Sequence, residues 1–278
     1  MSEPTAAPDL MDLAQQPRGD GLSAEKPRSL WRDSWDDLKR RKLFWFSLAL
    51  LILFLLMAAF PQLFTQKNPD YAELAKSLEG PSAEAWFGYD LQGRDVYART
   101  IYGARTSIVV GVLATLATVV LGGVAGIIAA YYSRWVDSII SRVGEIFLGV
   151  PYVLGAIIIL GTIAPVQSNP SRAMIMTVVI ITLALLGWPI LMRIARSAII
   201  QAKHQDYVVA ARALGAGPMR IIVKHLLPNS LAPILVYATI TIGSYIGAEA
   251  TLSLLGIGLR SPVISWGIAI ADHAQYIR

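Results

Sequence analysis

Five stretches of the chain are almost entirely apolar, and polar segments separate them. They cover residues 43–60, 106–132, 143–165, 173–195 and 230–255. About 18 or more apolar residues are enough to cross a bilayer as a helix. Within lipid, helices or closed barrels are needed to pair every backbone polar group. The pattern therefore predicts an all-α polytopic membrane protein with five transmembrane helices.

The region before the first apolar stretch has two parts. Residues 1–28 mix Pro, Gly, Ala, Asp and Gln without an apolar period, which predicts a disordered cytoplasmic tail. Residues 29–42 differ, because their apolar positions are spaced to share one side of a helix with charges between them. This pattern predicts an amphipathic helix at the membrane surface. The apolar positions are Leu30, Trp31, Trp35 and Leu38.

Composition and charge agree with this architecture. The chain is 55% hydrophobic and 15% charged, whereas soluble domains carry about 25% charged residues. A basic run, Lys39–Lys42, adjoins the first span and places the N-terminus in the cytoplasm. On that topology 16 Lys and Arg lie inside and 8 outside. The net charge of +5 is thus explained by membrane orientation, and no nucleic acid is expected as a partner.

A polar insert, Asp206–Asn229, separates the last two apolar stretches on the cytoplasmic side. Glycine accommodates the left-handed conformation that commonly ends a helix, so Gly215 predicts the end of a first short helix. Proline fits the first turn of a helix, so Pro218 predicts the start of a second, expected to end as the chain reaches Pro228. Two short helices joined at a glycine elbow suit docking into a groove on another protein.

The insert resembles the EAA loop of ABC importer permeases, and within that family the C-type subunit of dipeptide and oligopeptide systems. The resemblance rests on an alanine pair, then Gly215, then a Leu-Pro pair after a fixed gap. Val209 departs from the family pattern, where a glutamate is usual, and His225 stands where an isoleucine is usual. The alternative is an ordinary amphipathic loop. In the family this loop, here residues 196–229, is the coupling element that seats in a separate ATPase subunit. The resemblance assigns that role to Tyr207, Ala210, Ala211, Leu214, Gly215, Leu227 and Pro228.

A second motif lies in the segment expected on the outer side, residues 61–105. The stretch Phe87–Arg99 resembles the G-[TS]-D-x-x-G-R-D-x-x-[SA]-R signature of peptide-importer permeases and departs from it at Tyr89. Aspartate and glycine suit a tight turn, and the following Arg-Asp pair can cap or pair at the head of a helix. We expect the charges to form exposed ion pairs worth about 0–1 kcal/mol each. The signature positions are Gly88, Asp90, Gly93, Arg94, Asp95 and Arg99.

Three residues within the spans are candidates for the translocation path. Pro151 and Pro189 lie inside apolar stretches, where a proline bends a helix. Glu249 belongs to AEATLSLLGIG, which resembles the family's AEAxLSFLGLG, and an intramembrane carboxylate suggests a function. It lies about 28 Å along its span, close to the outer surface, and either lines the path or is structural.

Two further features of the spans have structural explanations. Glu145 lies one turn from Arg142 and is expected to pair with it. Gly122 and Gly126 form a small-xxx-small face that permits close approach of another helix, within this subunit or from a partner.

The chain lacks the motifs of a catalyst. It has no G-x-x-x-x-G-K-[ST] phosphate loop, no nucleophile–base constellation and no cysteine, and its three histidines are scattered. We therefore predict no catalytic, cofactor-binding or metal-binding residues in this chain. ATP and Mg²⁺ are expected on partner subunits.

The resemblance covers about residues 30–275, with residues 43–278 as the transmembrane domain, and implies a multi-pass protein of the cell membrane. It implies a homologous second permease, two ATPase subunits and an extracytoplasmic substrate-binding protein as partners, besides membrane lipid. The substrate would be a short peptide, with nickel or glutathione as alternatives in the same family. A self-sufficient secondary transporter or channel is the alternative of another class, and would require inverted repeats or mid-span carboxylates. Five spans leave Ser261–Arg278 on the outer side, whereas the resemblance implies a sixth span and a cytoplasmic C-terminus. The sequence is therefore expected to stop just before the last helix, either because it is truncated or because the protein departs from the family pattern.

Overall fold

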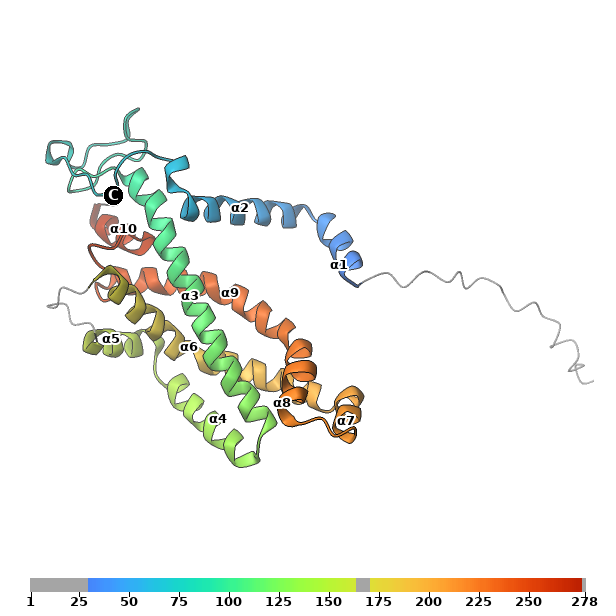
Figure 1. The fold of residues 1–278 in the computed structure, drawn as a ribbon. Helices are drawn as coiled ribbons and strands as arrows, with labels where there is room; N and C mark the ends of the chain where they lie inside the picture. Colours follow the sequence, from blue (N-terminus) through green and yellow to red (C-terminus); the bar gives the residue numbers. More distant parts are fainter. Residues whose placement is uncertain (1–29, 164–170, 277–278) are drawn as a thin grey trace, which may run out of the picture. The chain divides into compact units, whose positions relative to one another are not determined.

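The computed structural model describes residues 30–163 and 171–276 (Figure 1). The predicted cytoplasmic tail, residues 1–28, lies outside the described residues. The described residues divide into two units, with the boundary between Leu53 and Phe54. The described residues contain helices and no strand. The helices are α1 (Leu30–Lys39), α2 (Lys42–Ala59), α3 (Val96–Tyr131), α4 (Arg134–Gly149), α5 (Tyr152–Ile163), α6 (Arg172–Lys203), α7 (Asp206–Ala213), α8 (Pro218–Ile221), α9 (Leu227–Leu254) and α10 (Trp266–His273).

The membrane-spanning architecture predicted from the apolar stretches is confirmed. Four helices, Lys42–Ala59, Val96–Tyr131, Arg172–Lys203 and Pro218–Leu254, are long and apolar enough to span, and there are five spans if the bent pair α4 and α5 counts as one. The boundaries differ from those expected, because α3 begins at Val96 rather than near 106 and α6 continues to Lys203 rather than 195. The segment before α3 is correspondingly shorter, and contains only short 3-10 helices at Pro61–Leu63 and Leu74–Lys76.

Pro151 breaks the third expected span, so residues 143–165 do not form one straight helix. The α4 and α5 helices meet at an angle of 92°, and Val150 between them is extended, with φ −86° and ψ 123°. Proline has no N–H for the helical ladder and disfavours helical backbone at the residue before it. By contrast, Pro189 is accommodated inside α6.

The predicted end of the second short helix at Pro228 is wrong. From Pro218 to Leu254 the chain counts as a single helix of 37 residues. A π-helical turn, Ile222–Leu226, comes directly before the first turn of α9, which contains Pro228. The proline removes one helical hydrogen bond, and the wider π turn accommodates that loss without breaking the helix.

Three long helices, α3, α6 and α9, pack together in the second unit (Figure 1). A Cβ on Gly122 would lie 2.7 Å from the carbonyl of Trp188, and one on Gly126 would lie 2.7 Å from Ala195 Cβ. The predicted small-residue face is therefore confirmed as a close contact within this subunit, between α3 and α6. The contact partners advance in the same direction along both helices, so α3 and α6 run parallel. The hydrogen bond from Ser107 to Glu249 shows that α9 ends near the start of α3.

Candidate functional site

The elbow forms as the sequence predicted. Gly215 has φ +82° and follows α7, and Pro218 occupies the first turn of α8. The Gly215 N–H donates to Arg212 O and the Ala216 N–H to Ala211 O, each at 3.0 Å. This pair of bonds is the Schellman arrangement, which requires a left-handed residue and so favours glycine. The elbow is therefore specified locally.

One side of the elbow is anchored in the protein. Val208, Ile221 and Leu226 are buried in a cluster with residues from the ends of α3 and α6. The Lys203 ammonium group donates to the carbonyls of Ala130 and Tyr131 at 3.1 and 3.2 Å, at the C-terminal end of α3, where a cation is favourable. These contacts hold α7 and α8 against the ends of two spans.

The other side presents apolar side chains to the surface. Leu214 is 88% exposed and Met219 73% exposed, and Tyr207 is exposed as well. Exposed apolar side chains that lie outside the lipid are typical of protein–protein contacts. Of the residues predicted to couple to an ATPase, Ala210, Gly215 and Pro228 are also exposed, whereas Ala211 and Leu227 are half-buried. We call the exposed apolar side chains of Tyr207, Leu214 and Met219 the elbow surface.

A salt bridge that no sequence motif predicted connects α4 and α6 near the elbow end of the second unit. Arg196 on α6 donates to both carboxylate oxygens of Asp137 on α4, each at 2.6 Å. The two residues are 59 positions apart and belong to no motif, so no local signal pairs them. Such a bidentate pair fixes geometry as well as adding energy.

At the opposite end of α3, the signature motif forms a tight turn. Gly88 and Gly93 have φ of +74° and +72°. Asp90 Oδ1 accepts from the backbone N–H groups of Gln92 and Arg94 at 2.8 and 2.9 Å, and its Oδ2 accepts from Arg94 Nε at 2.6 Å. The predicted turn is confirmed. The expectation of exposed ion pairs is wrong, because Asp90 is only 2% exposed.

Asp95 begins α3 as the predicted cap. Its carboxylate accepts from the Ala98 N–H at 2.9 Å and from Lys67 Nζ at 2.8 Å. The hydrogen bond to Asp95 raises the pKa of Lys67 above its usual value. The charge at this helix start is thus satisfied on both sides.

The three path candidates lie in different elements: Glu249 in α9, Pro189 in α6 and Pro151 between α4 and α5. Glu249 is fully buried within the chain. It accepts hydrogen bonds from the hydroxyls of Ser107 on α3, Ser253 on α9 and Ser265 before α10, at 3.2, 2.8 and 3.0 Å. Pro189 is buried in α6 and Pro151 is exposed at the α4–α5 break. Their part in a path stays a prediction.

One smaller prediction can be compared directly with the structure. Arg142 donates to Glu145 at 3.1 Å, which confirms the expected pair on α4. Among the described residues, no group of three His, Cys, Asp or Glu side chains is placed to hold a metal ion.

Comparisons with known proteins converge on one family. Residues 122–276 match the family described as "binding-protein-dependent transport system inner membrane component", and residues 29–81 match the N-terminal transmembrane domain of oligopeptide transport permease C. The dipeptide transport system permease DppC of Alkalihalophilus pseudofirmus is 39% identical, over 94% of this chain and 82% of the relative. The protein of the same name from Bacillus subtilis is 36% identical, over 94% and 79%.

Among solved structures, an inward-facing MetNI methionine ABC transporter shares the fold. Its matching chain has a TM-score of 0.52 and 21% sequence identity, over 64% of this chain and 80% of that chain.

Proposed function

Because the chain belongs to the family of binding-protein-dependent transport system inner membrane components, we propose that it works as one of two permease subunits in an ATP-driven importer of short peptides. In this proposal, two ATPase subunits supply the energy and an extracytoplasmic binding protein delivers the peptide. The substrate class is supported by the relatives named as dipeptide permeases. The subunit contributes half of the path and does no chemistry on the peptide.

The observation that carries the proposal is the elbow surface. An apolar patch on a sharply turned, well-anchored pair of short helices suits insertion into a groove of a separate protein. We propose that this groove belongs to an ATPase subunit, and that the elbow lies in the cytoplasm. The cytoplasmic placement is supported by the excess of Lys and Arg, 16 against 8, in the segments on that side.

The helix connections suggest how force reaches the membrane. Since Pro218–Leu254 is one helix of 37 residues, a displacement of α8 by an ATPase moves α9 directly. The α7 side is connected to α3 through Lys203 and the buried cluster around Val208. The two arms of the elbow would therefore pass one motion to different spans, as a rigid-body change between inward and outward states requires.

The test compares three variants in a complex reconstituted with its ATPase subunits. An added Cβ at Gly215 would meet no atom of the described residues within 4 Å, so Gly215→Val acts through the strain of a β-branched residue at positive φ. Leu214→Glu places a charge at the most exposed apolar side chain of the elbow surface. Both should insert into the membrane normally, yet lose ATPase co-purification or substrate-stimulated ATP hydrolysis.

The matched control is Val209→Glu, which adds the same charge on α7 at a position where the family carries glutamate. It should retain ATPase binding. Wild-type co-purification and stimulated hydrolysis in both Gly215→Val and Leu214→Glu would refute the coupling role.

A further inference from the structure

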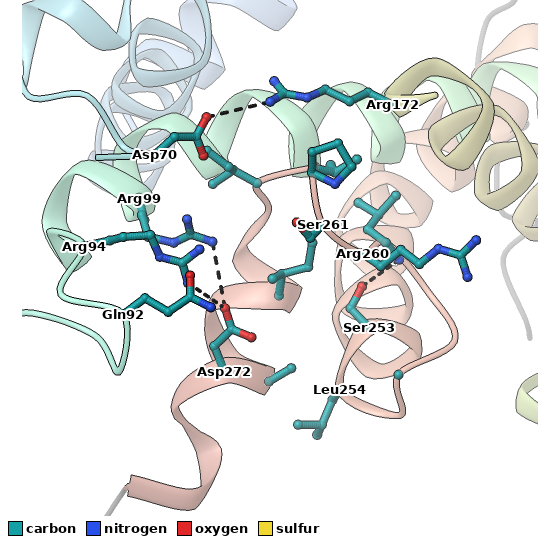
Figure 2. Close-up of a pocket in the computed structure, with 17 residues that line it drawn as sticks. Asp70, Gln92, Arg94, Arg99, Arg172, Ser253, Leu254, Arg260, Ser261 and Asp272 are labelled. Carbon is teal, nitrogen blue, oxygen red and sulfur yellow. Dashed lines mark hydrogen bonds and ion pairs between the residues drawn. The ribbon is translucent and has the colours of Figure 1, made fainter. Parts of the chain in front are cut away.

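A charged cleft lies at the end of the second unit opposite the elbow, where α3 and α6 begin and α9 ends (Figure 2). Its volume is about 470 Å³, within the range of roughly 300–1,000 Å³ that is usual for small-molecule sites. Four arginines and two aspartates contribute to its lining, so the cleft is positive, which favours an anion. These residues are Arg94, Arg99, Arg172, Arg260, Asp70 and Asp272.

Arg99 is the most informative of these side chains. It is 4% exposed, yet its Nε has no hydrogen-bond partner among the described residues. Its Nη1 makes one long bond, 3.4 Å, to the carbonyl of Pro69. A buried guanidinium group with five donors needs acceptors, because leaving charged donors unpaired is strongly unfavourable. The Nε lies 3.9 Å from the Asp90 carboxylate, which already accepts a hydrogen bond from Arg94. The charge of Arg99 therefore has acidic neighbours, but its guanidinium group keeps donors that a ligand in the cleft can use.

The ion pairs around Arg99 are also open. Asp272 lies 3.8 Å from Arg99 and 3.5 Å from Arg94, and Arg172 lies 3.7 Å from Asp70. Hydrogen-bonded pairs of these groups close to about 2.7–2.9 Å, as Arg94 does with Asp90 at 2.6 Å. The aspartates thus orient the arginines without occupying their donors. Figure 2 shows Arg99 and Arg172 reaching the cleft from different helices.

We propose that this cleft binds the terminal carboxylate of a short peptide, with the guanidinium groups of Arg99 and Arg172 as its donors. The planar fork of arginine matches a carboxylate in bidentate geometry. A dipeptide, about 7 Å long when extended, fits the volume. The terminal carboxylate is common to all unmodified peptides, so this recognition does not depend on side chains. The choice of a peptide as ligand rests on the function proposed above.

The test is direct binding of radiolabelled dialanine to the assembled permease–ATPase complex, without the binding protein, by equilibrium dialysis. Arg172→Gln removes the charged guanidinium group of an exposed side chain, and Arg99→Lys keeps the charge but removes the planar fork of donors. Each should weaken dialanine binding about tenfold or more, as should the amidated ligand dialaninamide. The loss caused by either arginine substitution and the loss caused by amidating the ligand should not add, because each removes the same contact between guanidinium and carboxylate. Arg142→Gln, on α4 and outside the lining of the cleft, is the control, and this variant should bind dialanine as the wild type does.

Several results would overturn the site. They are equal affinity for dialanine and dialaninamide, wild-type binding in both cleft variants, or the absence of dialanine binding by the wild-type complex. Competition by acetate or inorganic phosphate as strong as that by dialanine would show a general anion site and reject a peptide ligand. ATP-driven uptake of dialanine with the binding protein present separates the two proposals. Uptake without cleft binding would reject the cleft alone, whereas a wild-type complex that takes up no peptide would reject the proposed function.

Discussion

Removing the carboxylate of Glu249 should destabilise the protein far more than neutralising it. Each of its three serine partners uses its hydroxyl twice. Ser107 accepts from the Trp266 N–H at 3.1 Å, and Ser253 and Ser265 accept from the backbone N–H groups of Leu259 and Ile268 at 3.1 and 3.2 Å. All three then donate to Glu249. The carboxylate is therefore the common acceptor that connects α3, α9 and the start of α10.

The expected loss of folding stability follows from these hydrogen bonds. Glu249→Ala leaves three hydroxyls without an acceptor at about 1 kcal/mol or more each, and adds a cavity, so we expect a loss of about 3–5 kcal/mol. In Glu249→Gln the amide oxygen can keep the two bonds that Oε1 accepts, from Ser253 and Ser265. The amide nitrogen then faces Ser107, whose hydroxyl must turn away. One lost bond is worth about 1 kcal/mol.

The assay is thermal unfolding of the purified protein in detergent, followed by tryptophan fluorescence. At about 2–4 °C per kcal/mol for a chain of this size, Glu249→Ala should lower the apparent Tm by about 6 °C or more and Glu249→Gln by about 2–4 °C. Glu145→Ala, which breaks an exposed pair, is the control and should change it by about 2 °C or less. Equal Tm values for wild type and Glu249→Ala, or equal losses for Ala and Gln, would refute this reasoning.

Three other outcomes are expected. Gly126→Val should overpack the contact with Ala195 and lower stability by about 1–3 kcal/mol, measured by the same thermal assay; an unchanged Tm would contradict the close contact. Asp95→Ala should remove the cap of α3 and destabilise by about 0.5–2 kcal/mol, and Asp95→Asn should restore most of that loss. A cysteine at Ser82 should react with an impermeant thiol reagent from outside the cell, and one at Gln201 only after the membrane is permeabilised; the reverse labelling pattern would invert the topology.

Local features of the fold were predictable because their causes lie within a few residues. Apolar stretches of span length specify membrane helices. The left-handed Gly215 and the N-terminal Pro218 define the elbow, and Asp95 caps α3 through a bond to a residue three positions away. Each of these features depends on the local conformational preference of one residue or on the apolar character of one stretch, and both can be read directly from the sequence.

Prolines mark the limit of local reasoning. Pro151 separates α4 and α5, which meet at 92°. Pro228 lies in the first turn of α9, directly after a π-helical turn, and the helix continues through it. Pro189 lies inside α6. The residue is the same in all three places. Its effect depends on whether neighbouring backbone and packed side chains can compensate for the missing N–H, and only the tertiary structure shows this.

The charged clusters were decided entirely by the tertiary structure. Ser107 and Glu249 are 142 positions apart, and Arg196 and Asp137 are 59 apart. The sequence by itself determined an all-helical membrane protein with an elbow and a capped signature turn. It could not show that Arg99 is buried in a cleft, or that Glu249 is enclosed by serines, because burial depends on which distant segments pack together, and that packing is cooperative rather than local.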